Sequence, residues 1–194
     1  MNDKEHFGFV AEGPLSQGIN FATIEYTLAP AIRMDGIVEE IRQAVAWTVR
    51  HLGELGAATD GVYVAGHSAG GQLTAMVLAE PAIKGAILIS GVFDLEPIRL
   101  SYLNDKLGID QPEARRNSPL LHLPSQAPPL IVTVGGDELP ELRQQSEEYY
   151  RASIANNLRA QYLPLGSHEH FSILEELASP GGKLTASLVE LMAR

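Results

Sequence analysis

The stretch Gly66-His67-Ser68-Ala69-Gly70 places a serine between two glycines, directly after an apolar run and before a helix-forming segment. A serine in the pattern Gly-x-Ser-x-Gly, on a sharp turn from strand to helix, presents its hydroxyl at the carboxyl end of the strand, where it can attack a carbonyl carbon. Side chains at positions 66 and 70 would collide with neighbouring elements, which favours glycine at both. The alternative is a Gly/Ser turn that merely begins a helix, with Ser68 near its N-cap. The flanking segments favour the nucleophile.

A serine hydroxyl is a weak nucleophile until a base removes its proton, and that base needs an acid to orient it. Asp137 and His170 each follow a strand-like run further along the chain, so the three residue types occur in the order Ser, Asp, His. Glu138 is a rival acid, one residue deeper into the same loop. We predict a catalytic triad of Ser68, Asp137 and His170, with Asp137 preferred because it directly follows the strand.

Two histidines compete for the role of base. His168 and His170 also form a His-x-His pattern, which suggests zinc, but no third ligand is evident near them. We therefore predict no metal. His170 is preferred as the base because it directly precedes an apolar helix that would anchor it.

Short apolar runs typical of buried parallel strands alternate with segments of helical periodicity. The predicted strands cover residues 19–26, 61–66, 83–90, 129–136 and 159–165. A helical stripe runs from Ile37 to Leu52, with Asp35 as its predicted N-cap. Further helices are predicted after Ser68, over residues 141–157 and over residues 183–194. This alternation predicts an α/β fold whose mainly parallel sheet is built by right-handed crossovers.

The predicted organisation is a single domain over residues 1–194 with one excursion at about 91–128. The excursion is too long for a simple crossover and is rich in Pro, Asn and Asp, so we expect short helices that line a pocket. Candidate pocket residues are Tyr102, Asn104 and His67, which stands beside the nucleophile. Packing roles are the alternative for all three.

Composition limits the possible partners. The chain has 14 Lys and Arg against 24 Asp and Glu, a formal net charge of −10, and this balance argues against binding to nucleic acid. It contains no cysteine, which fits a cytoplasmic protein, and no apolar run reaches the length of a membrane span. We expect a small-molecule substrate, no nucleic acid, no membrane and a cytoplasmic location.

Several segments together resemble the α/β-hydrolases of the esterase/lipase group, and within that group the kynurenine formamidase (arylformamidase) branch. The matching segments are EYTLAP (25–30), GHSAGGQLTAM (66–76), SGVFDLEPIRLSYLND (90–105), RNSPL (116–120), GGDELPELRQQS (135–146) and HFSILEEL (170–177). The resemblance implies a three-layer sandwich in which Ser68 is the nucleophile, Asp137 the acid and His170 the base. It also implies hydrolysis of N-formyl-L-kynurenine to formate and kynurenine, a step of tryptophan breakdown, or of aryl esters, with no cofactor.

One feature of that group has no match here. Its members carry a His-Gly-Gly loop that gives backbone N–H groups to the oxyanion hole, and this sequence contains no His-Gly-Gly. We therefore expect an N-terminally abbreviated sheet of about five strands, with the N–H of Ala69 as the remaining oxyanion donor and impaired activity. A sheet with a new apolar edge also predicts a homodimer. The alternative function is a weakly active or inactive hydrolase fold that serves as a binding module or is a fragment of a longer enzyme.

Overall fold

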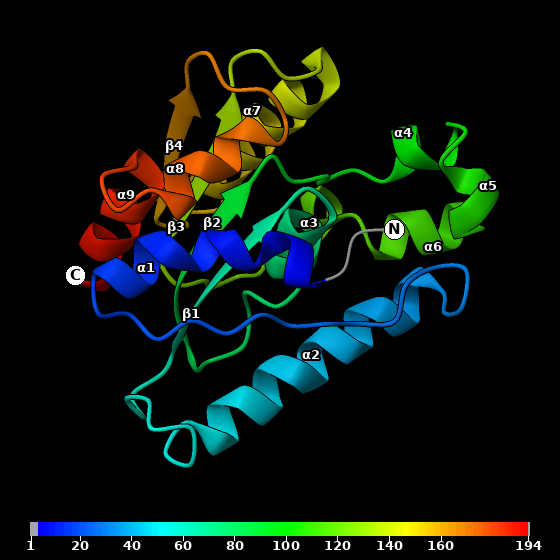
Figure 1. The fold of residues 1–194 in the computed structure, drawn as a ribbon. Coiled ribbons are helices and arrows are strands. Elements are labelled where there is room, and N and C mark those ends of the chain that lie inside the picture. Colours follow the sequence, from blue (N-terminus) through cyan, green and yellow to red (C-terminus); the bar gives the residue numbers. More distant parts are fainter. Residues whose placement is uncertain (1–3, 194) are drawn as a thin grey trace.

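The computed structural model describes residues 4–193, and over this range the chain forms a parallel sheet covered by helices (Figure 1). The sheet here contains four strands: β1 (Val62–His67), β2 (Ile83–Ile89), β3 (Leu130–Gly135) and β4 (Ala160–Leu165). Their spatial order is β1-β2-β3-β4, and every adjacent pair is parallel. All four carboxyl ends therefore lie at one edge of the sheet, where ligands bind in open α/β folds.

Side chains that alternate along the strands cover two separate faces. Ile87, Ile89 and Ile131 join one cluster of buried residues, and Ala86, Leu88 and Val132 join another. The first face is covered by η1 (Lys4–Ala11), α1 (Glu12–Ser16), η3 (Ser172–Leu174), α8 (Glu175–Ala178) and α9 (Lys183–Met192). The second face is covered by α2 (Met34–His51), α3 (Ala69–Ala75) and α7 (Pro140–Ala155). This arrangement confirms the predicted α/β three-layer sandwich.

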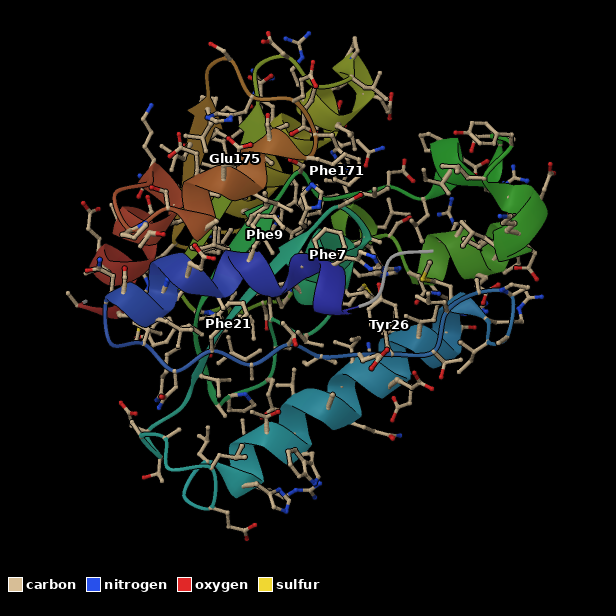
Figure 2. The ribbon with its side chains drawn as sticks, in the orientation of Figure 1. Phe7, Phe9, Phe21, Tyr26, Phe171 and Glu175 are labelled. Carbon is tan, nitrogen blue, oxygen red and sulfur yellow. The ribbon has the colours of Figure 1, made fainter. Side chains whose placement is uncertain are left out.

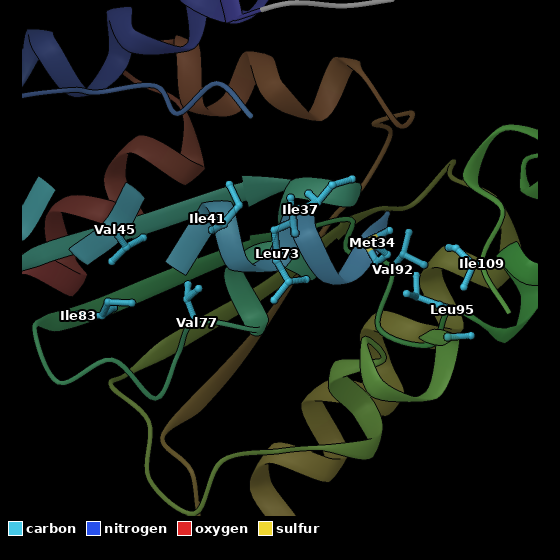
Figure 3. Close-up of a cluster of buried hydrophobic side chains, with 12 residues drawn as sticks. Met34, Ile37, Ile41, Val45, Leu73, Val77, Ile83, Val92, Leu95 and Ile109 are labelled. Atoms are coloured by element: carbon cyan, nitrogen blue, oxygen red, sulfur yellow. The ribbon is translucent and has the colours of Figure 1, made fainter. Parts of the chain in front are cut away.

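Helix α2 packs through the predicted apolar stripe, in which Ile37, Ile41 and Val45 face Leu73 and Val77 (Figure 3). Its N-terminus differs from the prediction. Arg33 occupies the N-cap and makes no side-chain capping bond. Asp35 lies instead in the first turn, where its carboxylate accepts hydrogen bonds from Arg116 and Asn117, at 2.7 Å each. These bonds use Asp35 to join α2 to the end of α6 (Gln111–Arg116).

The predicted strand at residues 19–26 is wrong. The segment is extended, but it pairs with no strand in the described part of the chain, and it runs between α1 and α2 (Figure 1). β1 accordingly has a strand neighbour on one side, β2, and is an edge strand over residues 4–193. A β-rich sequence specifies an extended conformation, but a strand also requires a neighbouring backbone to bond with. The sheet therefore has four strands here rather than about five.

The excursion at 91–128 contains the expected short helices, which are α4 (Glu96–Arg99), α5 (Asn104–Leu107), α6 and η2 (Pro119–Leu121). Its role in lining a pocket stays a prediction. Among the helices of residues 4–193, none is both long and apolar enough to cross a membrane.

Candidate active site

Ser68 stands on a strained turn between β1 and α3. Its backbone has φ 57° and ψ −117°, a conformation that residues other than glycine rarely adopt. Two main-chain hydrogen bonds hold the turn: the N–H of Ser68 donates to Ile89 O at the end of β2, at 2.9 Å, and Ser68 O accepts from the N–H of Gly71 at 2.9 Å. Gly66 permits this sharp reversal, because a Cβ there would lie 2.0 Å from Gly70 O. The local geometry is that of a nucleophile elbow.

The expected crowding at Gly70 is not found. A Cβ at Gly70 would meet nothing within 4 Å, whereas a Cβ at Gly71 would lie 2.7 Å from the Cα of Gly91. The second glycine that the turn requires for close packing is therefore Gly71, where α3 approaches the chain that leaves β2. Gly70 faces open space because it lies on the outer side of the first helical turn.

His170 is held by a buried carboxylate. Its Nδ1 lies 2.7 Å from Oε2 of Glu138, whose side chain is 0% exposed, while the side chain of His170 is 27% exposed. A carboxylate only accepts hydrogen bonds, so Nδ1 of the neutral imidazole carries the proton and Nε2 is left as an acceptor. This is the tautomer that a general base for a serine requires.

The residue that contacts His170 is Glu138, and not Asp137, the acid expected from the sequence. Residues 135–138 form a turn in which the N–H of Glu138 approaches Gly135 O at 3.4 Å. Asp137 occupies the outer corner of the turn and is exposed, and its N–H donates to His168 O at 3.1 Å. The reversal points the next side chain, that of Glu138, back toward the sheet edge. Asp137 is closer to the strand end than Glu138, but its side chain points into solvent and does not bond to His170.

Three donors surround the Glu138 carboxylate. Oε2 accepts from His170, while Oε1 accepts from the Ser90 hydroxyl and from the N–H of Gly135 at 2.9 Å. Burial would raise the pKa of Glu138, but the hydrogen bonds from His170, Ser90 and Gly135 outweigh it and hold this pKa below its ordinary value. Glu138 is therefore ionised at neutral pH, the state in which a carboxylate can orient a histidine.

Ser90 was not identified from the sequence. It is fully buried, follows β2 and has φ 50°, a second strained position at the carboxyl edge of the sheet. Its position in the sequence could have indicated it, because Ser90 ends an apolar run, as do the residues that follow β1, β3 and β4.

Two glycines bring the acid loop and the base loop together. A Cβ at Gly135 would lie 2.1 Å from His168 O, and a Cβ at Gly136 would lie 2.0 Å from Gly166 O. Any larger residue would push the loop after β3 away from the loop after β4. The Gly-Gly pair therefore sets the short distance over which Glu138 reaches His170.

His67, at the end of β1, contacts the loop after β4 that carries His170. Its Nε2 lies 2.6 Å from the backbone O of His170, and the two rings are tilted with centroids 4.5 Å apart. Phe171 lies beside both rings, at 5.8 Å from His67 and 5.1 Å from His170. Burial, with a smaller contribution from the charge of His170, lowers the pKa of His67 to about 4. His67 is thus a neutral donor at physiological pH.

The rival base His168 has a different partner. Its Nε2 lies 3.0 Å from Oε1 of Glu176, whose Oε2 accepts from the N–H of Lys183. These bonds tie the loop after β4 to the start of α9. Over residues 4–193 no three His, Asp or Glu side chains gather as a metal site.

Tyr102 and Asn104, the pocket candidates in the excursion at 91–128, are bonded or placed apart from His170 and Glu138. Asn104 closes its own loop, since its side chain bonds both N–H and O of Ile109, at 2.8 and 3.0 Å. Tyr102 is 81% exposed. Within residues 4–193 neither side chain makes a hydrogen bond or ring contact with His170. Their role as pocket residues stays a prediction.

Ala69 is the first residue of α3, where a backbone N–H has no partner inside the helix. In the described chain its N–H makes no backbone–backbone hydrogen bond. An N–H at this place, beside Ser68, can donate to an oxyanion.

The comparisons with known proteins agree with this geometry. Residues 15–173 match the family model described as the alpha/beta hydrolase fold. The chain belongs to the α/β-hydrolase family. Kynurenine formamidase of Danio rerio is 34% identical over 98% of this chain and 68% of its own length, and that of Salmo salar gives the same values. The hyperthermophilic esterase from the archaeon Pyrobaculum calidifontis superposes with a TM-score of 0.85 at 20% identity, covering 100% of this chain and 74% of that chain.

These matches confirm the expected family, the fold and the assignment to hydrolases. The similarity to the archaeal esterase, at 20% identity, speaks for the fold alone. The roles of individual residues in this α/β-hydrolase are taken up below as proposals.

Proposed function

We propose that this α/β-hydrolase cleaves a small aryl ester or formamide with Ser68 as nucleophile, His170 as general base and Glu138 as the orienting acid. The observation that carries the proposal is the contact between His170 Nδ1 and the buried Glu138 carboxylate, in a loop packed against the residue next to Ser68. His170 Nε2 takes the Ser68 proton as the hydroxyl attacks the carbonyl carbon, and then delivers it to the leaving group. Water repeats the sequence on the acyl-enzyme.

The oxyanion is assigned to the N–H of Ala69. A single oxyanion donor is worth about 10²–10³ in rate. Activated esters need less stabilisation than amides, so we expect this chain to cleave p-nitrophenyl acetate faster than a formamide. The formamide substrate class is supported by the two kynurenine formamidases that resemble the chain over 98% of its length.

An aryl group is favoured by the surroundings of the base. The ring of Phe171 is 61% exposed, although one side of it packs against His67 and His170. Phe171, labelled in Figure 2, directly precedes η3. An exposed aromatic face beside the base offers a flat apolar contact to an aryl substrate. We expect Phe171→Ala to raise KM for phenyl acetate about tenfold, and to leave KM for ethyl acetate within about twofold.

The test compares wild type, Ser68→Ala and a control, Ser16→Ala, whose hydroxyl bonds Gly13 O on α1. Cleavage of p-nitrophenyl acetate and covalent labelling by a fluorophosphonate probe are measured in each. Loss of both in Ser68→Ala alone supports the proposal. Wild type that neither cleaves nor labels contradicts it and favours the binding module, and unchanged cleavage in Ser68→Ala refutes the role of Ser68.

The homodimer is also a proposal. It is supported by the edge position of β1 within residues 4–193 and by Ile24, which is exposed in the unpaired segment nearby. Unpaired strand edges favour association with another strand. Light scattering at micromolar concentration is expected to give twice the mass of the chain, and a monomer mass contradicts the proposal. The cytoplasmic location and the part in tryptophan breakdown stay expectations.

A further inference from the structure

We infer that His67 is a positioning residue that fixes the base: its Nε2–H donates to the backbone carbonyl of His170 and ties the base loop to the nucleophile elbow. The inference rests on the proposed function, because it assigns a role within that same site. It concerns the orientation of His170, and not contact with the substrate.

The first step is the hydrogen bond. His67 is the last residue of β1, and residue 68 follows it directly. Its Nε2 lies 2.6 Å from His170 O, across 103 positions of sequence. A carbonyl oxygen only accepts, so the His67 Nε2 carries a proton and donates it. The contact therefore joins the main chain of the base to the element that carries the nucleophile.

The second step is the ring of His170, which is held from several directions. Glu138 binds Nδ1, the His67 ring lies at 4.5 Å, and Phe171 approaches edge-on at 5.1 Å. The Glu138 bond fixes one ring atom, but the ring can still shift when the main chain of His170 moves. The His67 contacts to the carbonyl and to the ring oppose this movement. Misplacement of a reacting group by about 1 Å can cost about 10² in rate.

The third step is charge. His170 gains a proton when it acts as base, so a second charged imidazole nearby would oppose the reaction. The titratable groups that face His67 are His170 and Glu138. Burial keeps His67 neutral down to about pH 4, so it donates a hydrogen bond without adding positive charge. A lysine or arginine donor at this position would not meet both requirements.

The experiment uses near-isosteric variants. His67→Gln keeps a side-chain N–H donor of similar reach, and His67→Met has a similar length but no donor. His67→Phe keeps a ring without a donor, and serves if His67→Met does not fold. The control is His51→Phe, because His51 makes the same two kinds of contact on α2: its Nδ1 lies 2.7 Å from Trp47 O, and its ring stacks at 4.3 Å on Trp47.

We expect kcat for p-nitrophenyl acetate to fall about 10- to 100-fold in His67→Met, with KM within about twofold of wild type. The kcat of His67→Gln is expected to be at least about fivefold higher than that of His67→Met, and the kcat of His51→Phe is expected to match that of wild type. An equal loss in the Gln and Met variants, or no loss in either donor-free variant, overturns the inference.

A second readout does not need activity. The proton on His170 Nδ1, shared with Glu138, gives a downfield NMR resonance that Glu138→Gln removes. We expect this resonance in wild type, His51→Phe and His67→Gln, and its loss through solvent exchange in the donor-free variants. Wild type without activity but with this pattern refutes the proposed function and supports the positioning role. A resonance unchanged in His67→Met overturns the positioning role whatever the activity.

Discussion

The assignment of Glu138 as the acid can be tested by replacing its carboxylate with an amide. In Glu138→Gln, the position of Oε1 receives two donors, the Ser90 hydroxyl and the Gly135 N–H. The amide oxygen must therefore lie there, and the amide NH₂ must face His170 Nδ1. An NH₂ group only donates, so it forces Nδ1 to be the acceptor and moves the imidazole proton to Nε2. The base can then no longer accept the Ser68 proton.

Mutation of the orienting aspartate to asparagine in a serine protease, which fixes the wrong tautomer in the same way, lowers kcat about 10⁴-fold, or roughly 5.5 kcal/mol of barrier. We expect a loss of this size in Glu138→Gln for p-nitrophenyl acetate, with KM nearly unchanged. The matched control is Asp137→Asn, one residue away and exposed, which should stay within about twofold of wild type. Circular dichroism confirms folding of both variants. A large loss in Asp137→Asn, with activity kept in Glu138→Gln, would refute the reasoning from the turn.

Three further predictions concern stability, each measured by urea or thermal unfolding. Ser90→Ala removes a donor to the ionised Glu138 and should lower the free energy of unfolding at pH 7 by about 1.5–3 kcal/mol. Because the pKa of Glu138 is lowered in the folded protein, the difference in unfolding free energy between wild type and Ser90→Ala should be present above the ordinary pKa of a glutamate. It should shrink as pH falls through the pKa of folded Glu138. A difference that grows on acidification would contradict the assigned bond. Gly66→Ala should lower the free energy of unfolding by more than about 3 kcal/mol, because its Cβ would collide with Gly70 O. Gly70→Ala should leave the free energy of unfolding unchanged or raise it by up to about 1 kcal/mol, because alanine favours the helix and meets no neighbour there. Equal losses in the two variants would argue against the elbow geometry. His67 has a folded pKa lowered to about 4, so wild type loses stability as pH falls from about 6.5 to 4, where the unfolded chain alone gains the proton. His67→Gln should be spared this loss of up to about 3 kcal/mol, and parallel pH profiles for the two proteins would show that the histidine is not buried as described.

The sequence predicted the strands that lie inside the sheet and not the segment that lies beside it. Residues 83–90 and 129–136 are apolar on both faces, and burial on both faces is what a central parallel strand requires. Residues 19–26 have comparable β propensity, yet in the described chain they pair with no strand. Propensity reports how one segment packs, whereas pairing depends on a second backbone that the segment itself does not encode.

The sequence placed the candidate site on the loops after three strands, but it did not distinguish neighbouring residues within the loop after β3. Ser68 and His170 were proposed from the sequence because a strained elbow and a strand end both have sequence signals. The choice between Asp137 and Glu138 depends on how a four-residue turn reverses, and this is decided by close contacts of Gly135 and Gly136 with the loop after β4. Those contacts join segments about 30 residues apart in sequence, and no local pattern reveals them.

The order of the strands explains which residues lie at the carboxyl edge of the sheet, but it does not explain how His170 contacts residues from β1 and β3. The parallel strands β1, β2, β3 and β4 deliver Ser68, Ser90, Glu138 and His170 to one edge, in that order. Neighbouring strands lie about 4.8 Å apart, so the ends of β1 and β4 are separated by roughly 14 Å. The loop after β4 must therefore cross back over the sheet edge before its His170 can contact His67 at the end of β1. Glu138 reaches it from β3, and His67 binds its carbonyl from β1. The loop after β4 is therefore held by one contact from the loop after β3 and by another from β1, at the opposite end of the sheet order from β4.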